Sequence, residues 1–236
     1  MVVLAGGLGT RIASSAPDVP KALVPVLGEP FAFHQLRLLA AQGVRDVLYI
    51  VGHLGTQIRK AVGDGSAFQL TVSYVDEAES PHGTGGALRF ALDHHELPET
   101  FGVLYGDSYL PIDLTPVWPA FEASGRPALM TVCRNEDRWE RSNAVLEDGV
   151  VTRYDKSPTA REPAMKWIDY GLAVLRRDVV DAIPSDSVVD LADVYRDLSA
   201  RRELAGYEVS ERFYEVGSPG GLAELEAHLG ATFDNA

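Results

Sequence analysis

Short apolar runs that alternate with helical stretches, from Val2 to Leu110, constrain the fold of this chain most. The first run, Val2–Ala5, ends in two glycines, which is typical of a buried strand that leads into a loop. Strands joined by helices usually pair in parallel and carry helices on both faces of their sheet. We therefore expect an α/β fold, a Rossmann-like three-layer sandwich with a mostly parallel mixed sheet. The expected strands are 2–5, 46–51, 70–75 and 101–105, and the expected helices are 31–42, 54–62 and 85–95.

The second half of the chain is less regular. Its strand-like runs are separated by polar turns, and we expect them to extend the same sheet. Asp190 precedes a helical stretch and is a suitable N-terminal cap for it. We expect a single domain over residues 1–236, with one half at 1–110 and the other at 111–236. The expected strands are 128–134, 143–147, 151–154, 167–175, 207–209 and 213–216, and the expected helices are 191–201 and 219–229.

The composition narrows the class of protein. The 236 residues carry a formal net charge of −13 without a cluster of Lys and Arg, so no nucleic-acid partner is expected. No apolar run is long enough to span a bilayer and no signal peptide precedes the first strand, so no membrane partner is expected either. Cys133, the single cysteine, is expected to be a buried strand residue, and it fits a reducing, cytoplasmic location.

The glycines after the first strand predict a phosphate-binding loop, because Ala5–Arg11 reads AGGLGTR. Glycine lets the backbone approach a ligand closely, and backbone N–H groups can then surround phosphate oxygens. Arg11 adds a charged donor, and Lys21, which follows Pro20, is a second candidate phosphate ligand. A dinucleotide-binding loop would need a third glycine, and a Walker loop would end in Gly-Lys-Ser/Thr; this segment has neither pattern.

Further motifs follow this loop in a recognisable order. With it, they resemble the signature of the sugar-1-phosphate nucleotidyltransferases, the pyrophosphorylases that make nucleotide sugars. The joint match covers nearly the whole chain and is far more specific than any one motif. Its Gly-Thr-Gly-Gly-Ala pattern is similar to heptose 1-phosphate guanylyltransferases and, to a lesser extent, to muramic-acid 1-phosphate uridylyltransferases. The matching segments are Leu4–Arg11 with Pro20-Lys21, Pro81–Ala87, Gly106-Asp107, Tyr154–Pro158 and Phe213–Pro219.

The resemblance implies that a nucleoside monophosphate passes from a nucleoside triphosphate to a sugar 1-phosphate and that pyrophosphate leaves. It makes residues 1–110 the nucleotide-binding half and residues 111–236 the sugar-binding half and lid. Asp107 and Glu215 are the implied ligands of Mg²⁺, the expected cofactor, although many relatives have Asp at the position of Glu215. The task of the site is to bring two anions together and to stabilise charge on the α-phosphate. The implied catalytic residues are Arg11, Lys21, Asp107 and Lys156.

The base specificity is less well defined than the reaction. Glu79 falls in a segment that lies against the nucleobase in this family, and an ionised carboxylate can accept from both the N1–H and the amino group of guanine. This slightly favours GTP, but some relatives with an acidic residue here use UTP, and a solvated loop position explains Glu79 equally well. The implied nucleotide-binding residues are Leu4, Ala5, Gly6, Gly7, Gly9, Thr10, Arg11, Glu79, Gly83 and Thr84.

The acceptor sugar is expected to differ from the commonest ones. Trp167–Leu172 reads WIDYGL where relatives usually show Asn-Ala-Gly, and Asp169 could accept hydrogen bonds from sugar hydroxyls. A hexose or a heptose fits this reading. For Tyr109, ordinary packing is an alternative to a place in the acceptor pocket. The implied sugar-phosphate-binding residues are Lys156, Asp169, Gly171, Tyr109 and Asn143.

Three other readings stay open at this point. A related transferase could use UTP, CTP or dTTP, or could charge phosphocholine from CTP, which would favour an aromatic cage for the quaternary ammonium. A catalytically silent regulatory subunit could bind a nucleotide on the same fold. A nicotinamide-dependent oxidoreductase is the third reading, and the failed dinucleotide pattern argues against it. The expected partners are a nucleoside triphosphate and a sugar 1-phosphate, and a homodimer is an assembly that the sequence allows.

Overall fold

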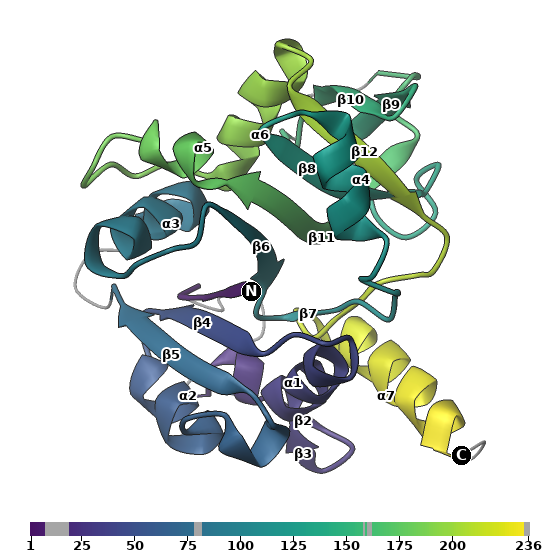
Figure 1. Ribbon diagram of the computed structural model, residues 1–236. Helices are drawn as coiled ribbons and strands as arrows, with labels where there is room; N and C mark the ends of the chain where they lie inside the picture. The colour runs from purple at the N-terminus through teal and green to yellow at the C-terminus, as the bar shows by residue number, and fades with distance from the viewer. Residues whose placement is uncertain (8–18, 78–81, 158, 160–161, 234–236) are drawn as a thin grey trace. The chain divides into compact units, whose positions relative to one another are not determined.

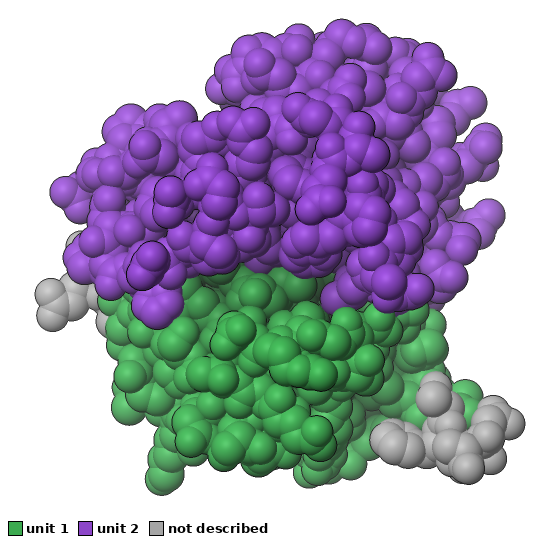
Figure 2. Space-filling view, viewed as in Figure 1, with its two compact units in different colours: residues 1–81, 104–111, 213–236 green, residues 82–103, 112–212 purple. Residues whose placement is uncertain are grey.

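The computed structural model describes residues 1–7, 19–77, 82–157, 159 and 162–233, and it divides the chain into two compact units (Figures 1 and 2). Unit 1 comprises residues 1–81, 104–111 and 213–236, and unit 2 comprises residues 82–103 and 112–212. Each unit therefore combines segments that are far apart in the sequence. The expectation of a single domain with halves at 1–110 and 111–236 stays a prediction.

Three parallel strands form the sheet of unit 1. Its central strand β4 (Asp46–Val51) pairs with β1 (Val2–Ala5) and with β5 (Thr71–Asp76). In Figure 1, α1 (Phe31–Ala41) and α2 (Gly55–Val62) lie together beside β4 and β5. The carboxyl ends of these parallel strands meet at one edge, which is where such sheets bind ligands. The other elements of unit 1 are η1 (Lys21–Leu23), β2 (Pro25–Val26), β3 (Glu29–Pro30), η2 (Ser66–Phe68), β7 (Ser108–Tyr109), β13 (Tyr214–Glu215) and α7 (Pro219–Phe233).

The sheet of unit 2 is mixed. β11 (Trp167–Arg176) runs antiparallel to β8 (Ala128–Arg134), which pairs in parallel with β12 (Leu204–Val209). On the other side of β12, β10 (Val150–Tyr154) is antiparallel both to β12 and to β9 (Ala144–Glu147). The strand β6 (Thr100–Tyr105) leaves unit 2 after Val103 and enters unit 1 at Leu104. The helices of unit 2 are α3 (Gly83–His94), α4 (Val117–Ser124), α5 (Arg177–Asp181) and α6 (Leu191–Ala200).

The expected fold class is confirmed: the protein is α/β with a mixed sheet. β1, β4 and β8 have the predicted bounds, and Cys133 is buried in β8 with 2% of its surface exposed. Burial raises the pKa of the Cys133 thiol. No helix within the described residues is long and apolar enough to cross a membrane.

The structure contains two helices that we did not predict, α4 and α5. Pro119 falls in the first turn of α4, where a missing N–H costs nothing. Helix α5 has only 5 residues, too few for a periodic pattern. Helix α3 was predicted from Gly85 but begins at Gly83.

The glycines at the start of α3 let another segment of unit 2 approach closely. The backbone N–H groups of Gly85 and Gly86 both donate to Val189 O, at 2.9 and 3.1 Å. A Cβ on Gly83 would lie 2.6 Å from the same oxygen, and a Cβ on Gly86 would clash with Ser187 O. Gly83 also has a φ of +72°, which favours glycine. The Gly-Thr-Gly-Gly-Ala pattern is thus required for packing in this unit.

We predict that Gly86→Ala destabilises the protein although it replaces a helical glycine. Alanine normally stabilises a helix interior by up to about 1 kcal/mol, but here the added methyl meets the backbone of Ser187, and overpacking costs about 1–3 kcal/mol. Gly230→Ala is the matched control, because a Cβ on Gly230 in α7 meets no described atom within 4 Å. Urea unfolding would measure both variants, and a Gly86→Ala protein as stable as Gly230→Ala would contradict the packing role.

Candidate functional site

The turn that follows β6 places Asp107 beside the end of β1. The Gly106 N–H donates to Leu4 O at 2.9 Å, which joins the turn to the first strand. A Cβ on Gly106 would lie 3.0 Å from the Cβ of Ala5, so the two backbones approach as closely as a glycine allows. Asp107 therefore emerges next to the point where the predicted phosphate loop begins.

Two carboxylates and an ammonium group meet at this turn. Lys21 Nζ lies 2.7 Å from Asp107 Oδ2, and the two side chains are 21% and 26% exposed. Glu215 joins them because β13 pairs antiparallel with β7, which places Glu215 opposite Ser108, and because Val216 N–H donates to Asp107 O at 3.0 Å. Lys21 Nζ, Glu215 Oε2 and Asp107 Oδ2 all lie within 4 Å of the point that a Cβ on Gly217 would occupy. The structure thus brings together three of the residues predicted from the sequence.

The chemistry of this cluster suits a hard divalent cation. Mg²⁺ is commonly held by one or two carboxylates together with phosphate oxygens and waters. Asp107 and Glu215 supply two carboxylates on one side of Gly217, and Lys21 supplies a charge that a phosphate would complement. Within the described residues no three His, Cys, Asp or Glu side chains form a closed protein-only metal site. The donor set therefore fits a cation that shares its coordination with a substrate.

The described part of the phosphate loop is built for close approach. Leu4 and Ala5 end β1, and Gly6 and Gly7 follow them. A Cβ on Gly6 would lie 2.5 Å from Glu77 Oε1, whereas a Cβ on Gly7 would meet no described atom within 4 Å. Three predicted residues of the loop, Gly9, Thr10 and Arg11, lie outside the described residues, and so does Glu79.

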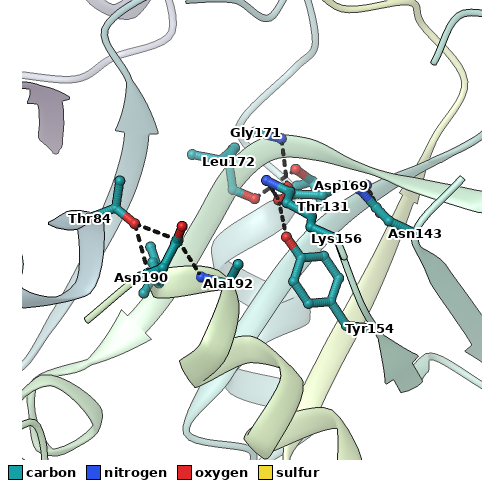
Figure 3. Close-up of polar contacts among 11 residues, drawn as sticks. Thr84, Thr131, Asn143, Tyr154, Lys156, Asp169, Gly171, Leu172, Asp190 and Ala192 are labelled. Carbon is teal, nitrogen blue, oxygen red and sulfur yellow. Dashed lines mark hydrogen bonds and ion pairs between the residues drawn. The ribbon is translucent and has the colours of Figure 1, made fainter. Parts of the chain in front are cut away.

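A second cluster lies in unit 2 around Asp169 (Figure 3). Lys156 Nζ lies 3.1 Å from Asp169 Oδ2, and the hydroxyl of Tyr154 donates to the same oxygen at 3.0 Å. Gly171 N–H donates to Asp169 Oδ1 at 2.9 Å, and Asp169 N–H donates to Asn143 Oδ1 at 2.9 Å. Three residues of the predicted sugar-phosphate set, Lys156, Gly171 and Asn143, thus each contact a fourth, Asp169. Asp169 was predicted to accept hydrogen bonds from sugar hydroxyls. In the structure its carboxylate already accepts from protein groups.

The turn that carries Lys156 is also polar and charged. Ser157 N–H donates to Asp155 Oδ1 at 2.8 Å, and this backbone hydrogen bond lowers the pKa of Asp155. The carboxylate of Asp155 is therefore ionised at neutral pH. The two neighbours of Lys156 in sequence, Asp155 and Ser157, bond to each other in this turn, and Lys156 contacts Asp169.

Thr84 makes a structural junction at the start of α3 (Figure 3). Its hydroxyl donates to Asp190 Oδ1 at 2.9 Å and accepts from Leu191 N–H at 2.8 Å. Asp190 also accepts from Ala192 N–H at 2.9 Å, which confirms it as the N-terminal cap of α6. Gly83 and Thr84 were predicted to bind nucleotide, and within unit 2 their described contacts fix α3 to α6. The nucleotide role of these two residues stays a prediction.

Tyr109 belongs to the core of unit 1. Its ring is 9% exposed and packs in a cluster of buried residues with Val26, Phe31 and Val216, against which α7 places Leu225 and Leu229. Burial raises the pKa of the Tyr109 hydroxyl. The packing role that the sequence allowed for this residue is the one that its surroundings support.

Comparison with known proteins places the chain in a family. The family model of the MobA-like NTP transferase domain matches residues 1–204. The chain belongs to the MobA-like NTP transferase domain family. Because the match covers β1 through the start of β12, it includes Lys21, Asp107, Lys156 and Asp169.

The relatives of this MobA-like chain are sugar-1-phosphate nucleotidyltransferases. It is 31% identical to the mannose-1-phosphate guanylyltransferase of Mycobacterium tuberculosis, over 97% of this chain and 64% of that protein. It is 28% identical to the N-acetylmuramate alpha-1-phosphate uridylyltransferase of Neisseria meningitidis, over 98% of both chains. The chain spans 52% and 64% of the length of the first two curated relatives that it matches. In fold it is similar to HddC from Yersinia pseudotuberculosis, with a TM-score of 0.79, 22% identity, and coverage of 97% of this chain and 98% of HddC.

One residue of this MobA-like domain that supports the clusters was missed from the sequence, Gln35, and another, Tyr154, was given no role. Gln35 is 1% exposed, and its Nε2 donates to Tyr105 O at 2.9 Å and to Ser108 O at 2.7 Å. Its Oε1 is buried without a hydrogen-bond partner among the described residues. A polar side chain on the buried face of an apolar helix was the available signal for Gln35. Tyr154, which ends β10, lay in the matching segment Tyr154–Pro158, but nothing local showed that its hydroxyl reaches Asp169.

We predict that Gln35→Leu lowers the free energy of unfolding by about 1–3 kcal/mol, because it leaves the buried carbonyls of Tyr105 and Ser108 without the donor that bridges them. Lys60→Leu on the exposed face of α2 is the control and should change stability by less than about 0.5 kcal/mol. Chemical unfolding of both variants would test this. Equal stabilities would argue against a stabilising role for the Gln35 bridge between Tyr105 O and Ser108 O.

Proposed function

We propose that this protein transfers a nucleoside monophosphate from a nucleoside triphosphate to a sugar 1-phosphate and releases pyrophosphate. The observation that carries the proposal is the meeting of Lys21, Asp107 and Glu215 at the turn after β6, beside the glycines that end β1. Membership of the MobA-like family supports it, as do relatives named for this type of reaction. A second, separate support is the lysine of unit 2, Lys156, which is held by a carboxylate.

In this proposal the two substrates are held by different groups of residues. The triphosphate is bound by Leu4, Ala5, Gly6 and Gly7 with the loop residues Gly9, Thr10 and Arg11, and Lys21 holds a phosphate near the reacting centre. Lys156 binds the phosphate of the sugar. An oxygen of that phosphate forms the new bond to the α-phosphorus, and the bond to the leaving pyrophosphate breaks with its electron pair. The attacking oxygen is already an anion, so the protein has to position it and offset charge rather than remove a proton.

A divalent cation is part of the proposal, and Mg²⁺ is the cation we propose. Asp107 and Glu215 would hold it, together with phosphate oxygens of the nucleotide. When bound, the cation supplies positive charge that neutralises the phosphate oxygens. Lys21 occupies Asp107 Oδ2 in the described structure, so cation binding and the Lys21–Asp107 ion pair compete for one oxygen.

For the substrates we propose GTP and a hexose or heptose 1-phosphate. Relatives whose names include guanylyltransferase and uridylyltransferase both match the chain, so the family alone does not select the base. The slight preference for GTP rests on Glu79, through its two acceptor oxygens. The single buried Cys133 and the use of a nucleoside triphosphate support a cytoplasmic location.

The reaction is tested by pyrophosphate release from each common nucleoside triphosphate with a panel of hexose and heptose 1-phosphates and Mg²⁺. Release that needs one triphosphate and one sugar phosphate together is expected. Asp107→Asn should lower the rate at least about 100-fold, because it removes one of the two carboxylates proposed to hold the cation that offsets phosphate charge. Glu122→Gln, an exposed carboxylate of α4, is the control and should keep the full rate. A folded protein that binds nucleotide but releases no pyrophosphate with any pair would favour a regulatory subunit or a phosphocholine-type acceptor.

The cation site can be tested without turnover, with Mn²⁺ as the probe. Asp107→Asn should weaken Mn²⁺ binding to the nucleotide-free protein by about tenfold or more, since one of two carboxylates loses its charge. Lys21→Met should strengthen it, because the ammonium that competes for Asp107 Oδ2 is gone. Electron paramagnetic resonance of free Mn²⁺ measures both effects. Unchanged affinity in both variants would remove Asp107 from the cation site.

A further inference from the structure

The carboxylate of Asp169 is buried and nearly saturated with hydrogen bonds. Only 5% of its side chain is exposed. Oδ2 accepts from Tyr154 and from Lys156, and Oδ1 accepts from Gly171 N–H (Figure 3). An ionised carboxylate offers about four acceptor positions, so three of them are in use within the protein. A sugar hydroxyl would have to displace one of these partners or enter a space that solvent barely reaches.

The backbone of β11 is shaped to hold Asp169 in this position. The register between β11 and β8 shifts between Asp169 and Ala173, which marks a bulge, and Gly171 within it has a φ of +100°. That conformation lets the Gly171 N–H turn back onto Asp169 Oδ1. The hydroxyl of Thr131 on β8 donates to Leu172 O at 2.7 Å and so fixes the far side of the bulge. Bulges often re-aim a side chain beside a functional site.

The lysine that contacts Asp169 has the opposite exposure. The side chain of Lys156 is 43% exposed while that of Asp169 is 5% exposed. The lysine stem is flexible and carries substantial rotamer entropy, so a free lysine at this position would sample many orientations. An ammonium group has three N–H donors and can hold Asp169 and a phosphate oxygen at the same time. The ion pair therefore orients Lys156 without preventing it from binding an anion.

We propose that Asp169 is a positioning residue that acts through Lys156, and that it does not bind the sugar. The inference rests on the proposed function, because it takes the phosphate of the acceptor as the anion that Lys156 receives. A charged carboxylate beside a phosphate would repel it, and the shared ammonium removes that repulsion. Because it orients Lys156, Asp169 contributes to affinity for the phosphate of the acceptor. The choice among sugar hydroxyls is left to other residues.

A double-mutant cycle with Asp169→Asn and Lys156→Met tests this inference. Asp169→Asn alone should raise the KM for the sugar 1-phosphate at least about fivefold and leave the KM for the nucleotide unchanged, in keeping with coupling between contacting charged residues. In the Lys156→Met background the same change should have less than about a twofold effect, because its target is gone. Glu147→Gln, an exposed carboxylate of β9, controls for loss of negative charge in unit 2. An equal effect of Asp169→Asn in both backgrounds would show a direct contact with the sugar and overturn the proposal.

Asp169→Glu is the second variant, and it separates charge from shape. It keeps the carboxylate, so its effect on the sugar-phosphate KM should be smaller than that of Asp169→Asn. A larger effect would mean that the bulge geometry matters and not the ion pair, which counts against the proposal. Near-UV circular dichroism of each variant verifies that the fold is intact.

A readout that needs no substrate separates this inference from the proposed function. Nuclear magnetic resonance of ¹³C-dimethylated lysines follows the titration of Lys156, assigned by its loss in Lys156→Met. Asp169→Asn should lower the pKa of Lys156, because a nearby opposite charge favours the ammonium form. A lowered pKa together with no turnover of any sugar phosphate would leave the Asp169–Lys156 coupling standing and reject the proposed reaction. An unchanged pKa would reject the coupling itself.

Discussion

The turn between β6 and β7 is the constraint on which the cluster of unit 1 depends. It carries Asp107, and three separate groups fix its backbone: Leu4 O accepts from Gly106, Val216 N–H donates to Asp107 O, and the Gln35 amide bridges Tyr105 O and Ser108 O. A buried amide whose oxygen has no hydrogen-bond partner among the described residues is costly, so the bonds made by its nitrogen have to offset that cost. The bonds of the Gln35 amide therefore fix the position of the turn that carries Asp107 at some cost in local stability.

A net charge of −13 sets the second constraint, because a protein that is acidic overall has to gather cations where it binds anions. Both lysines of the proposed site are paired with carboxylates in the described structure, Lys21 with Asp107 and Lys156 with Asp169. Each pair orients its lysine before a substrate arrives. The pairs differ in consequence. Asp107 is partly exposed and is a proposed cation ligand, so its pair would exchange partners, whereas the buried Asp169 would keep its lysine throughout.

The sequence was sufficient for features that depend on local pattern and insufficient for those that depend on distant partners. The bounds of β1, β4 and β8 follow from their apolar runs, and the meeting of Lys21, Asp107 and Glu215 followed from a resemblance to a family. The packing role of the glycines at the start of α3 was not predicted, since nothing local reveals that Val189 O, about a hundred residues on, receives the N–H groups of Gly85 and Gly86. Gln35 was missed for the same reason, because its two acceptors lie 70 and 73 residues away.

The contacts of Asp169 give a physical reason for a carboxylate, and not an amide, at this position. The family pattern that the sequence resembles has Asn-Ala-Gly in this neighbourhood, and an asparagine would present one acceptor oxygen and one donor nitrogen. Whichever way that amide turned, its NH2 would face another donor, either Lys156 and Tyr154 on one side or the Gly171 N–H on the other, whereas both oxygens of Asp169 accept. A carboxylate also offsets the charge of the lysine in a place where Asp169 itself is shielded from water. If the proposed coupling holds, a change at Asp169 should be tolerated best when Lys156, which it contacts, changes with it.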